Sequence, residues 1–106
     1  MLYFEWDPAK AAANLEKHGI SFGAAAAALD DPYAIEAEDQ IVEGELRLRT
    51  IGMADGEIIV TVSHTNRLGS HDDGEIARII SARRATKSER RRYDELRSQS
   101  GWNPAH

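Results

Sequence analysis

The sequence predicts a single α+β domain in which two helices precede most of an antiparallel β-sheet and one helix follows it. Three observations lead to this fold class. The chain has 106 residues, a length typical of one domain. Capping patterns for helices occur near both ends, whereas runs of β-branched and alternating apolar residues fill the middle. Short connections join those runs, so we expect the strands to pair antiparallel.

The N-terminal third is expected to form a short strand and two helices. Residues Leu2–Trp6 are apolar and aromatic, which favours a strand. Asp7-Pro8 supplies an N-cap and a first helical residue, and Gly19 suits the left-handed end of that helix. Ser21 caps a second helix over about residues 22–29, whose five consecutive alanines allow another element to approach closely.

The middle of the chain is expected to supply most of the sheet. Residues 33–38 are predicted to form a short strand, followed by an acidic loop. Residues 45–54 and 57–65 flank Asp55-Gly56, which is the strongest short signal for a β-hairpin. The second of these runs is apolar on both faces, as expected of a central strand.

The C-terminal part is expected to contain a polar loop, a further strand and the last helix. The loop covers residues 66–74 and the strand residues 76–82. Thr86 and Glu89 form a T-x-x-E capping box, which predicts a helix that runs to about Arg97.

Length and composition limit the class of protein. We expect one domain over residues 1–97 and a flexible or partner-dependent tail over residues 98–106. The chain has no cysteine, which excludes disulfides and thiolate chemistry. No apolar run reaches the roughly 18 residues that a membrane helix needs, and the N-terminus lacks the pattern of a signal peptide. A cytoplasmic protein that does not bind membranes is therefore expected.

Charge is distributed unevenly along the chain. The net charge of −5 by itself argues against a nucleic-acid partner. Residues 1–75 contain five Lys or Arg and fifteen Asp or Glu, whereas residues 76–106 contain eight and three. The basic end suggests a face that binds a polyanion, and the alternative is a solvated charged helix. We favour the solvated alternative for Arg90–Arg92, so that Arg78 within a strand and Arg83 after it are the more informative cations.

The hairpin predicts which side chains share a face of the sheet. With a two-residue loop at Asp55-Gly56, Arg47 lies opposite His64. Side chains alternate between the two faces of a strand, so one face is predicted to carry four polar residues: Glu45, Arg47, Arg49 and His64.

Such a cluster could cleave RNA without a metal ion. Attack by a 2′-hydroxyl needs a base for its proton, an acid for the leaving 5′-oxygen and cations for the charge around phosphorus. Histidine can serve as acid or base, and arginine binds phosphate while staying charged. The alternative is a surface salt bridge across the strands, which would contribute less than about 1 kcal/mol.

Three segments, taken together, carry a resemblance to a known family. They are Phe4–Pro8 with Asn14–Phe22, Glu45–Arg47 leading to Ile51-Gly52, and Arg78–Lys87 with Glu89–Arg91 and Tyr93. Their order and spacing resemble the BrnT family of type II toxin–antitoxin systems over about residues 3–95. The first and last segments are the more specific ones.

This resemblance implies a RelE-like fold and an endoribonuclease toxin that needs no cofactor and blocks translation by cleaving RNA. The partner it implies is a BrnA-like antitoxin with a ribbon–helix–helix part, in a heterotetramer that contacts operator DNA only through the antitoxin. The catalytic positions of the family correspond here to Arg47, His64, Arg78 and Arg83. The expected RNA-binding residues are Lys10, Glu45, Arg67, Arg84 and Lys87.

Two other classes of function stay open at the level of sequence. The same scaffold could be a non-catalytic module whose basic face docks an antitoxin or nucleic acid, which the acidic first 75 residues favour. A DNA-binding regulator is less well supported, because the sequence has no helix-turn-helix pattern.

Overall fold

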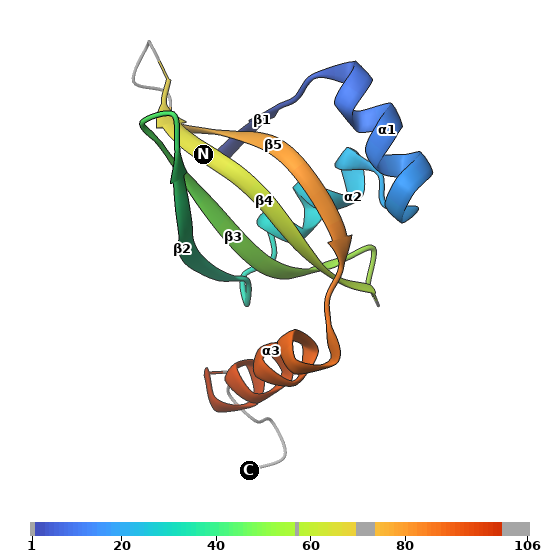
Figure 1. Cartoon of the computed structure of the whole chain (residues 1–106). Helices are drawn as coiled ribbons and strands as arrows, with labels where there is room; N and C mark the ends of the chain where they lie inside the picture. The colour runs from blue at the N-terminus through green and yellow to red at the C-terminus, as the bar shows by residue number, and fades with distance from the viewer. Residues whose placement is uncertain (1, 57, 70–73, 101–106) are drawn as a thin grey trace.

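A single sheet organises the chain. The computed structural model describes residues 2–56, 58–69 and 74–100. Within them, five strands take the order β1-β5-β4-β3-β2, with β1 parallel to β5 and the other neighbours antiparallel (Figure 1). The predicted α+β class is confirmed. The elements are β1 (Leu2–Glu5), α1 (Pro8–His18), α2 (Phe22–Leu29), β2 (Ile35–Val42), β3 (Glu45–Ala54), β4 (Ile58–Leu68), β5 (Glu75–Arg84) and α3 (Lys87–Ser100).

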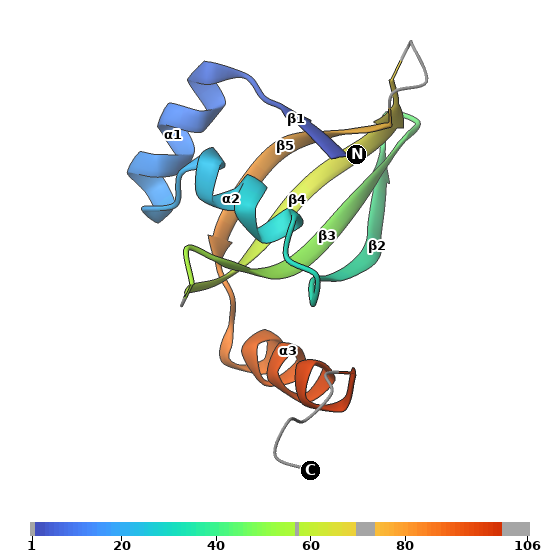
Figure 2. The same cartoon turned by 180° about the vertical axis from the view of Figure 1, so that it is seen from behind.

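The sheet has two faces of different character. Figure 2 shows α2 lying across one face, which we call the covered face; Figure 1 looks at the opposite, open face. The covered face carries Thr50, Gly52, Ala54, Val60, Val62, His64, Ala77, Ile79 and Ala82. The open face carries Arg47, Arg49, Thr61, Ser63, Arg67, Arg78, Ser81 and Arg83.

Local capping forms the first two helices as predicted. The Asp7 carboxylate accepts a hydrogen bond from the Ala9 N–H at 2.9 Å, and α1 ends at Gly19 with a left-handed φ of 71°. The Ser21 hydroxyl accepts from the Ala24 N–H at 3.0 Å at the start of α2. These bonds satisfy N–H groups that have no partner inside their own helix.

The alanine-rich helix α2 packs directly on the covered face. Phe22, Ala25 and Ala28 are buried in one core cluster with Val60, Val62 and Ile79 of the sheet. At Gly52 the two backbones meet, because a Cβ there would lie 2.2 Å from the Ala28 carbonyl oxygen. Small residues on both elements therefore permit a close approach of helix and sheet.

Asn14 attaches α1 to the sheet at the point where the pairing of β1 has ended. β1 pairs with β5 as far as Arg78. Further along, the Asn14 amide nitrogen donates to the Ala82 carbonyl at 2.9 Å, and its oxygen accepts from the Ala82 N–H at 3.0 Å. The same nitrogen donates to the Ile20 carbonyl at 2.8 Å. This one side chain thus takes the place of a strand partner and orients α1.

β2 is longer than predicted, and it includes the acidic stretch that we expected to be a loop. The strand ends at Val42, and Glu43 and Gly44 then adopt positive φ values of 51° and 80°. Two such residues make a tight hairpin turn, so β2 continues to pair with β3 up to that turn. β4 also runs further than predicted, to Leu68. Residues 70–73 of the predicted loop lie outside the described residues.

The β3–β4 hairpin is present, but its predicted register is wrong by one residue. Ala54 pairs with Ile58 instead of Glu57, and Glu57 itself lies outside the described residues. Three residues therefore connect the paired ends of the two strands, where the Asp-Gly signal predicted two.

This shift changes the face on which the histidine stands. Leu48, and not Arg47, pairs with His64. The predicted register would have placed Arg49 on the same face as Val62, under α2. Burying an arginine there is costly, so the longer connection keeps the arginines on the open face.

The last helix begins with the predicted capping box. The Glu89 N–H donates to the Thr86 hydroxyl at 3.1 Å, and the Thr86 N–H donates to the Glu89 carboxylate at 2.8 Å. The helix continues to Ser100, past the predicted end near Arg97, and residues 101–106 lie outside the described residues. No helix in the described ranges is long and apolar enough to cross a membrane.

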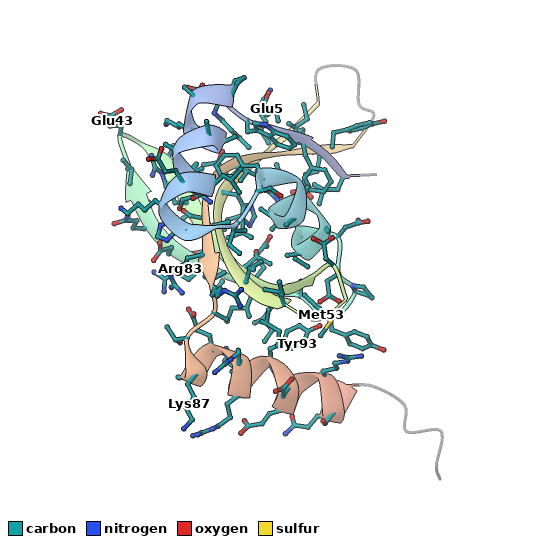
Figure 3. All side chains as sticks on the ribbon, turned by 90° about the vertical axis from the view of Figure 1, so that its right-hand side faces the viewer. Glu5, Glu43, Met53, Arg83, Lys87 and Tyr93 are labelled. Carbon is teal, nitrogen blue, oxygen red and sulfur yellow. The ribbon has the colours of Figure 1, made fainter. Side chains whose placement is uncertain are left out.

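A buried tyrosine docks α3 against the rest of the fold. Tyr93 lies between α3 and the sheet, and its hydroxyl donates to Asp31 (Figure 3). Asp31 also accepts from the Met53 N–H at 2.8 Å and the Tyr33 N–H at 2.9 Å. Burial raises the pKa of Tyr93 to about 12, with a further contribution from the Asp31 carboxylate.

Candidate functional site

The open face gathers arginines from three strands. Because side chains alternate along a strand, Arg47 and Arg49 of β3 point to this face, together with residues of β4 and β5 at matching register. The side chains of Arg49, Arg67, Arg78 and Arg83 are between 39% and 55% exposed, so a large anion can reach them.

A pocket of about 240 Å³ lies on this face where strands β2 to β5 meet the end of α1. Its polar lining consists of two arginines, three hydroxyls, a carboxylate and an imidazole: Arg49, Arg83, Thr61, Ser63, Ser81, Asp39 and His18. Two guanidinium groups beside several hydroxyl donors form a suitable environment for a phosphate group.

Arg83 is held firmly at one side of this pocket. Its Nη1 donates to Glu89 Oε1 at 2.8 Å, and its Nη2 donates to Glu89 Oε2 at 3.2 Å. The hydrogen bond from Arg83 lowers the pKa of Glu89 to about 2, with smaller contributions from the Thr86 N–H and the Thr61 hydroxyl. Figure 3 shows Arg83 where β5 leads into α3. Arg49 is anchored differently, by a bond of 2.8 Å to Asp39.

Two further predicted residues form a separate cluster around Glu5. Arg67 donates a hydrogen bond to the Glu5 carboxylate, and Arg78 lies 3.9 Å from it. The hydrogen bond from Arg67 lowers the pKa of Glu5, against a smaller opposing effect of burial. Neither arginine lines the pocket that contains Arg83.

Arg47 and Glu45 share the open face of β3, as predicted. Arg47 is half-buried, and its Nε is a buried donor without a partner in the described residues. Glu45 is exposed at the start of the strand. The structure brings neither of them to His64.

His64 lies on the covered face and is only 1% exposed. Its Nδ1 is 2.8 Å from Asn66 Oδ1, and its Nε2 is 2.8 Å from the Thr50 hydroxyl. The Asn66 amide nitrogen donates to Glu75, so its oxygen faces the ring and accepts from Nδ1. Nε2 then accepts from Thr50, which is the pattern of a neutral imidazole. Burial lowers the pKa of His64 accordingly.

The prediction that His64 shares a face with Arg47 is therefore wrong. The pocket nearest to His64, of about 270 Å³, is also lined by Asp31 and Glu36. Among the described residues, this lining contains two carboxylates and no lysine or arginine, which disfavours the binding of a phosphate there.

The remaining predicted RNA-binding residues are dispersed. Lys10 is exposed on α1. Arg84 is exposed at the end of β5, where it pairs with Val60 and so projects to the side opposite Arg83. Lys87 is exposed at the first position of α3, at the same end of the molecule as Arg83 (Figure 3).

Sequence reasoning did not include His18 among the candidate site residues, although His18 lines this pocket. Asn14 and His18 lie four positions apart and therefore share one face of α1. Because Asn14 is bonded to the backbone of Ala82, the same face carries His18 to Ser81 and Arg83. No group of three or more His, Asp or Glu in the described ranges is arranged to hold a metal ion.

The chain is similar to proteins of one family. The family model for the ribonuclease toxin BrnT of type II toxin–antitoxin systems matches residues 6–89. The crystal structure of the Brucella abortus ribonuclease toxin BrnT is similar over 82% of this chain and 99% of that chain, with 28% sequence identity and a TM-score of 0.59. No curated protein matches the chain.

Proposed function

This chain belongs to the BrnT family of ribonuclease toxins of type II toxin–antitoxin systems, and we propose that it cleaves RNA in the pocket on the open face. The observation that carries this location is the pocket lining. Two guanidinium groups, Arg49 and Arg83, stand there with the imidazole of His18.

Arg49 and Arg83 bind the RNA phosphate at which the RNA strand is cut. The 2′-oxygen forms a bond to phosphorus and the bond from phosphorus to the 5′-oxygen breaks. One proton leaves the 2′-hydroxyl and another reaches the 5′-oxygen. An imidazole can take up or release a proton near neutral pH, so His18 carries one of these two transfers and solvent water carries the other. Arginine offsets the negative charge that accumulates around phosphorus, so no metal ion is needed.

The other cations of the open face bind the RNA on either side of the cut. Arg47 lies on the same strand face as Arg49, and Arg67 and Arg78 lie around Glu5. Lys87 contributes from the start of α3. His64 supports the sheet and takes no part in proton transfer, because it is buried beneath the opposite face.

A toxin of a type II system has an antitoxin partner. We infer that this antitoxin is BrnA-like, neutralises the toxin in a heterotetramer and carries the contact with operator DNA. The toxin itself would be one domain, in which α3 continues through residues 98–100 of the predicted tail. It would act on RNA in the cytoplasm.

The test is cleavage by the purified chain in the presence of EDTA. We expect a defined RNA to be cut, and we expect Arg83→Ala and His18→Ala to remove at least about 99% of the rate, consistent with the usual cost of losing one charge-stabilising or proton-transferring group. Expression of the intact chain alone should arrest growth, and both variants should relieve the arrest.

A non-catalytic binding module is the second candidate, and one observation favours it. Three carboxylates, Glu5, Asp39 and Glu89, pair with arginines of the open face and reduce its positive charge. Intact RNA after incubation with the pure chain, together with retained binding of antitoxin, would select this alternative.

A further inference from the structure

Glu89 does more than cap the last helix. Four donors from three parts of the fold converge on its carboxylate. They are both Nη atoms of Arg83, the Thr61 hydroxyl at 3.0 Å and the Thr86 N–H at 2.8 Å. A helix cap alone needs just the last of these bonds.

The direction of these bonds decides which edge of Arg83 is engaged. Glu89 occupies the Nη1–Nη2 end of the guanidinium, and Nη1 also donates to the Arg84 carbonyl at 3.2 Å. In the described residues, every hydrogen bond of Arg83 thus comes from its Nη atoms. The second edge, formed by Nε–H and the outer Nη2–H, has the two parallel donors that bind phosphate bidentately.

Glu89 itself has little freedom to move. Thr61 holds it from β4 and the Thr86 N–H holds it from the start of α3. Its low pKa keeps it ionised throughout the physiological range. A fixed carboxylate at one edge of an arginine orients the other edge. We therefore interpret Glu89 as a residue that positions Arg83, and not as one that merely neutralises its charge.

We propose that Glu89 is a positioning residue for RNA cleavage, which holds Arg83 with its Nε edge directed to the phosphate in the pocket. The proposal rests on the proposed function in one respect, namely that Arg83 binds the phosphate at the cut. It also links the docking of α3 to the state of the site, since the same carboxylate begins the helix.

The first arm of the test is steady-state cleavage of a short RNA by the full chain and its variants. Glu89→Gln keeps the size of the side chain and loses the charge and the paired acceptors. We expect kcat to fall at least about tenfold with KM changed by less than about threefold, because the arginine acts mainly on the transition state. In the Arg83→Ala background, Glu89→Gln should cause no further loss.

Thr86→Ala is the matched control for helix capping. It removes the acceptor of the Glu89 N–H and leaves the carboxylate on Arg83. We expect a melting temperature lowered by a few degrees and a kcat within about twofold of the parent chain. Equal loss of kcat in Thr86→Ala and Glu89→Gln, or a more active Glu89→Gln, would overturn the proposal.

The second arm observes the Arg83 Nε–H by NMR and does not depend on cleavage. In the parent chain we expect one sharp signal that shifts on addition of inorganic phosphate. In Glu89→Gln we expect a broadened signal and a lost or weaker response to phosphate; an unchanged signal and response would contradict the positioning role. If the parent chain cuts no RNA but this NMR difference is present, the proposed function fails, whereas the orientation of Arg83 toward phosphate by Glu89 stands.

Discussion

The two faces of the sheet place titratable and charged side chains in opposite situations. On the covered face, His64 is enclosed by Thr50 and Asn66 and kept neutral by burial. On the open face, Arg83 and Arg49 are held by carboxylates but remain more than one-third exposed. Both arrangements are ordered by hydrogen bonds, but an RNA phosphate can reach just the second one. Reactivity therefore depends on access as well as on residue type.

The largest effect on stability is expected from a substitution at the contact between α2 and the covered face. Gly52→Ala would drive a Cβ to 2.2 Å from a backbone carbonyl of α2, which no side-chain motion can relieve. We expect a loss of roughly 3 kcal/mol in the free energy of unfolding, measured by urea denaturation. Gly23→Ala is the control: its Cβ would lie 3.8 Å from Ser21 Oγ, so stability should be equal or slightly higher.

Removing the buried imidazole should cost about 2 kcal/mol of stability. His64→Ala leaves the Thr50 hydroxyl and the Asn66 amide without their partner and opens a cavity. Folded protein, prepared below the unfolding transition, should still cut RNA within about threefold of the parent rate. A stable His64→Ala protein without activity would instead indicate that the covered face takes part in catalysis.

The same histidine should make stability depend on pH. Its pKa is lowered in the folded chain, so below the ordinary value of about 6.5 the unfolded chain binds the proton more readily. Stability should therefore be constant above that pH and fall as the pH decreases below it, by at most about 1.4 kcal/mol per pH unit for one proton. Comparing unfolding curves of the parent chain and His64→Gln over this pH range isolates the contribution of His64; identical pH profiles would refute it.

The smallest effect on stability is expected on the open face. Arg49 is 47% exposed in its pair with Asp39, so Arg49→Ala should change the free energy of unfolding by less than about 1 kcal/mol. Affinity for RNA should fall several-fold, and the slope of log affinity against log salt should decrease by about one. Arg84→Ala, which removes the same charge from the other side of β5, should leave both quantities nearly unchanged.

The sequence was most informative where structure is decided locally. Asp7, Ser21 and the Thr86–Glu89 pair cap their helices as predicted, because each cap involves neighbours within three residues. The strands β3, β4 and β5 were also placed, and the family was identified from its motifs. The open face of β3 was anticipated from the alternation of side chains.

The site was less predictable because it depends on contacts between distant segments. One extra residue in the β3–β4 connection moved His64 to the other face, and that choice reflects burial under α2. His18 reaches the pocket because Asn14 is bonded to Ala82, across 68 positions of the chain. Nothing in the local pattern around either histidine indicates these outcomes.

The most direct test of the account compares Arg83→Ala with His64→Gln in one RNA cleavage assay, with folding monitored by circular dichroism. We expect Arg83→Ala to keep its fold and lose at least about a hundredfold in rate, as after loss of a charge-stabilising donor. His64→Gln should keep its fold and cut within about threefold of the parent rate. A folded His64→Gln protein that has lost activity, beside an active Arg83→Ala protein, would contradict the assignment of catalysis to the open face.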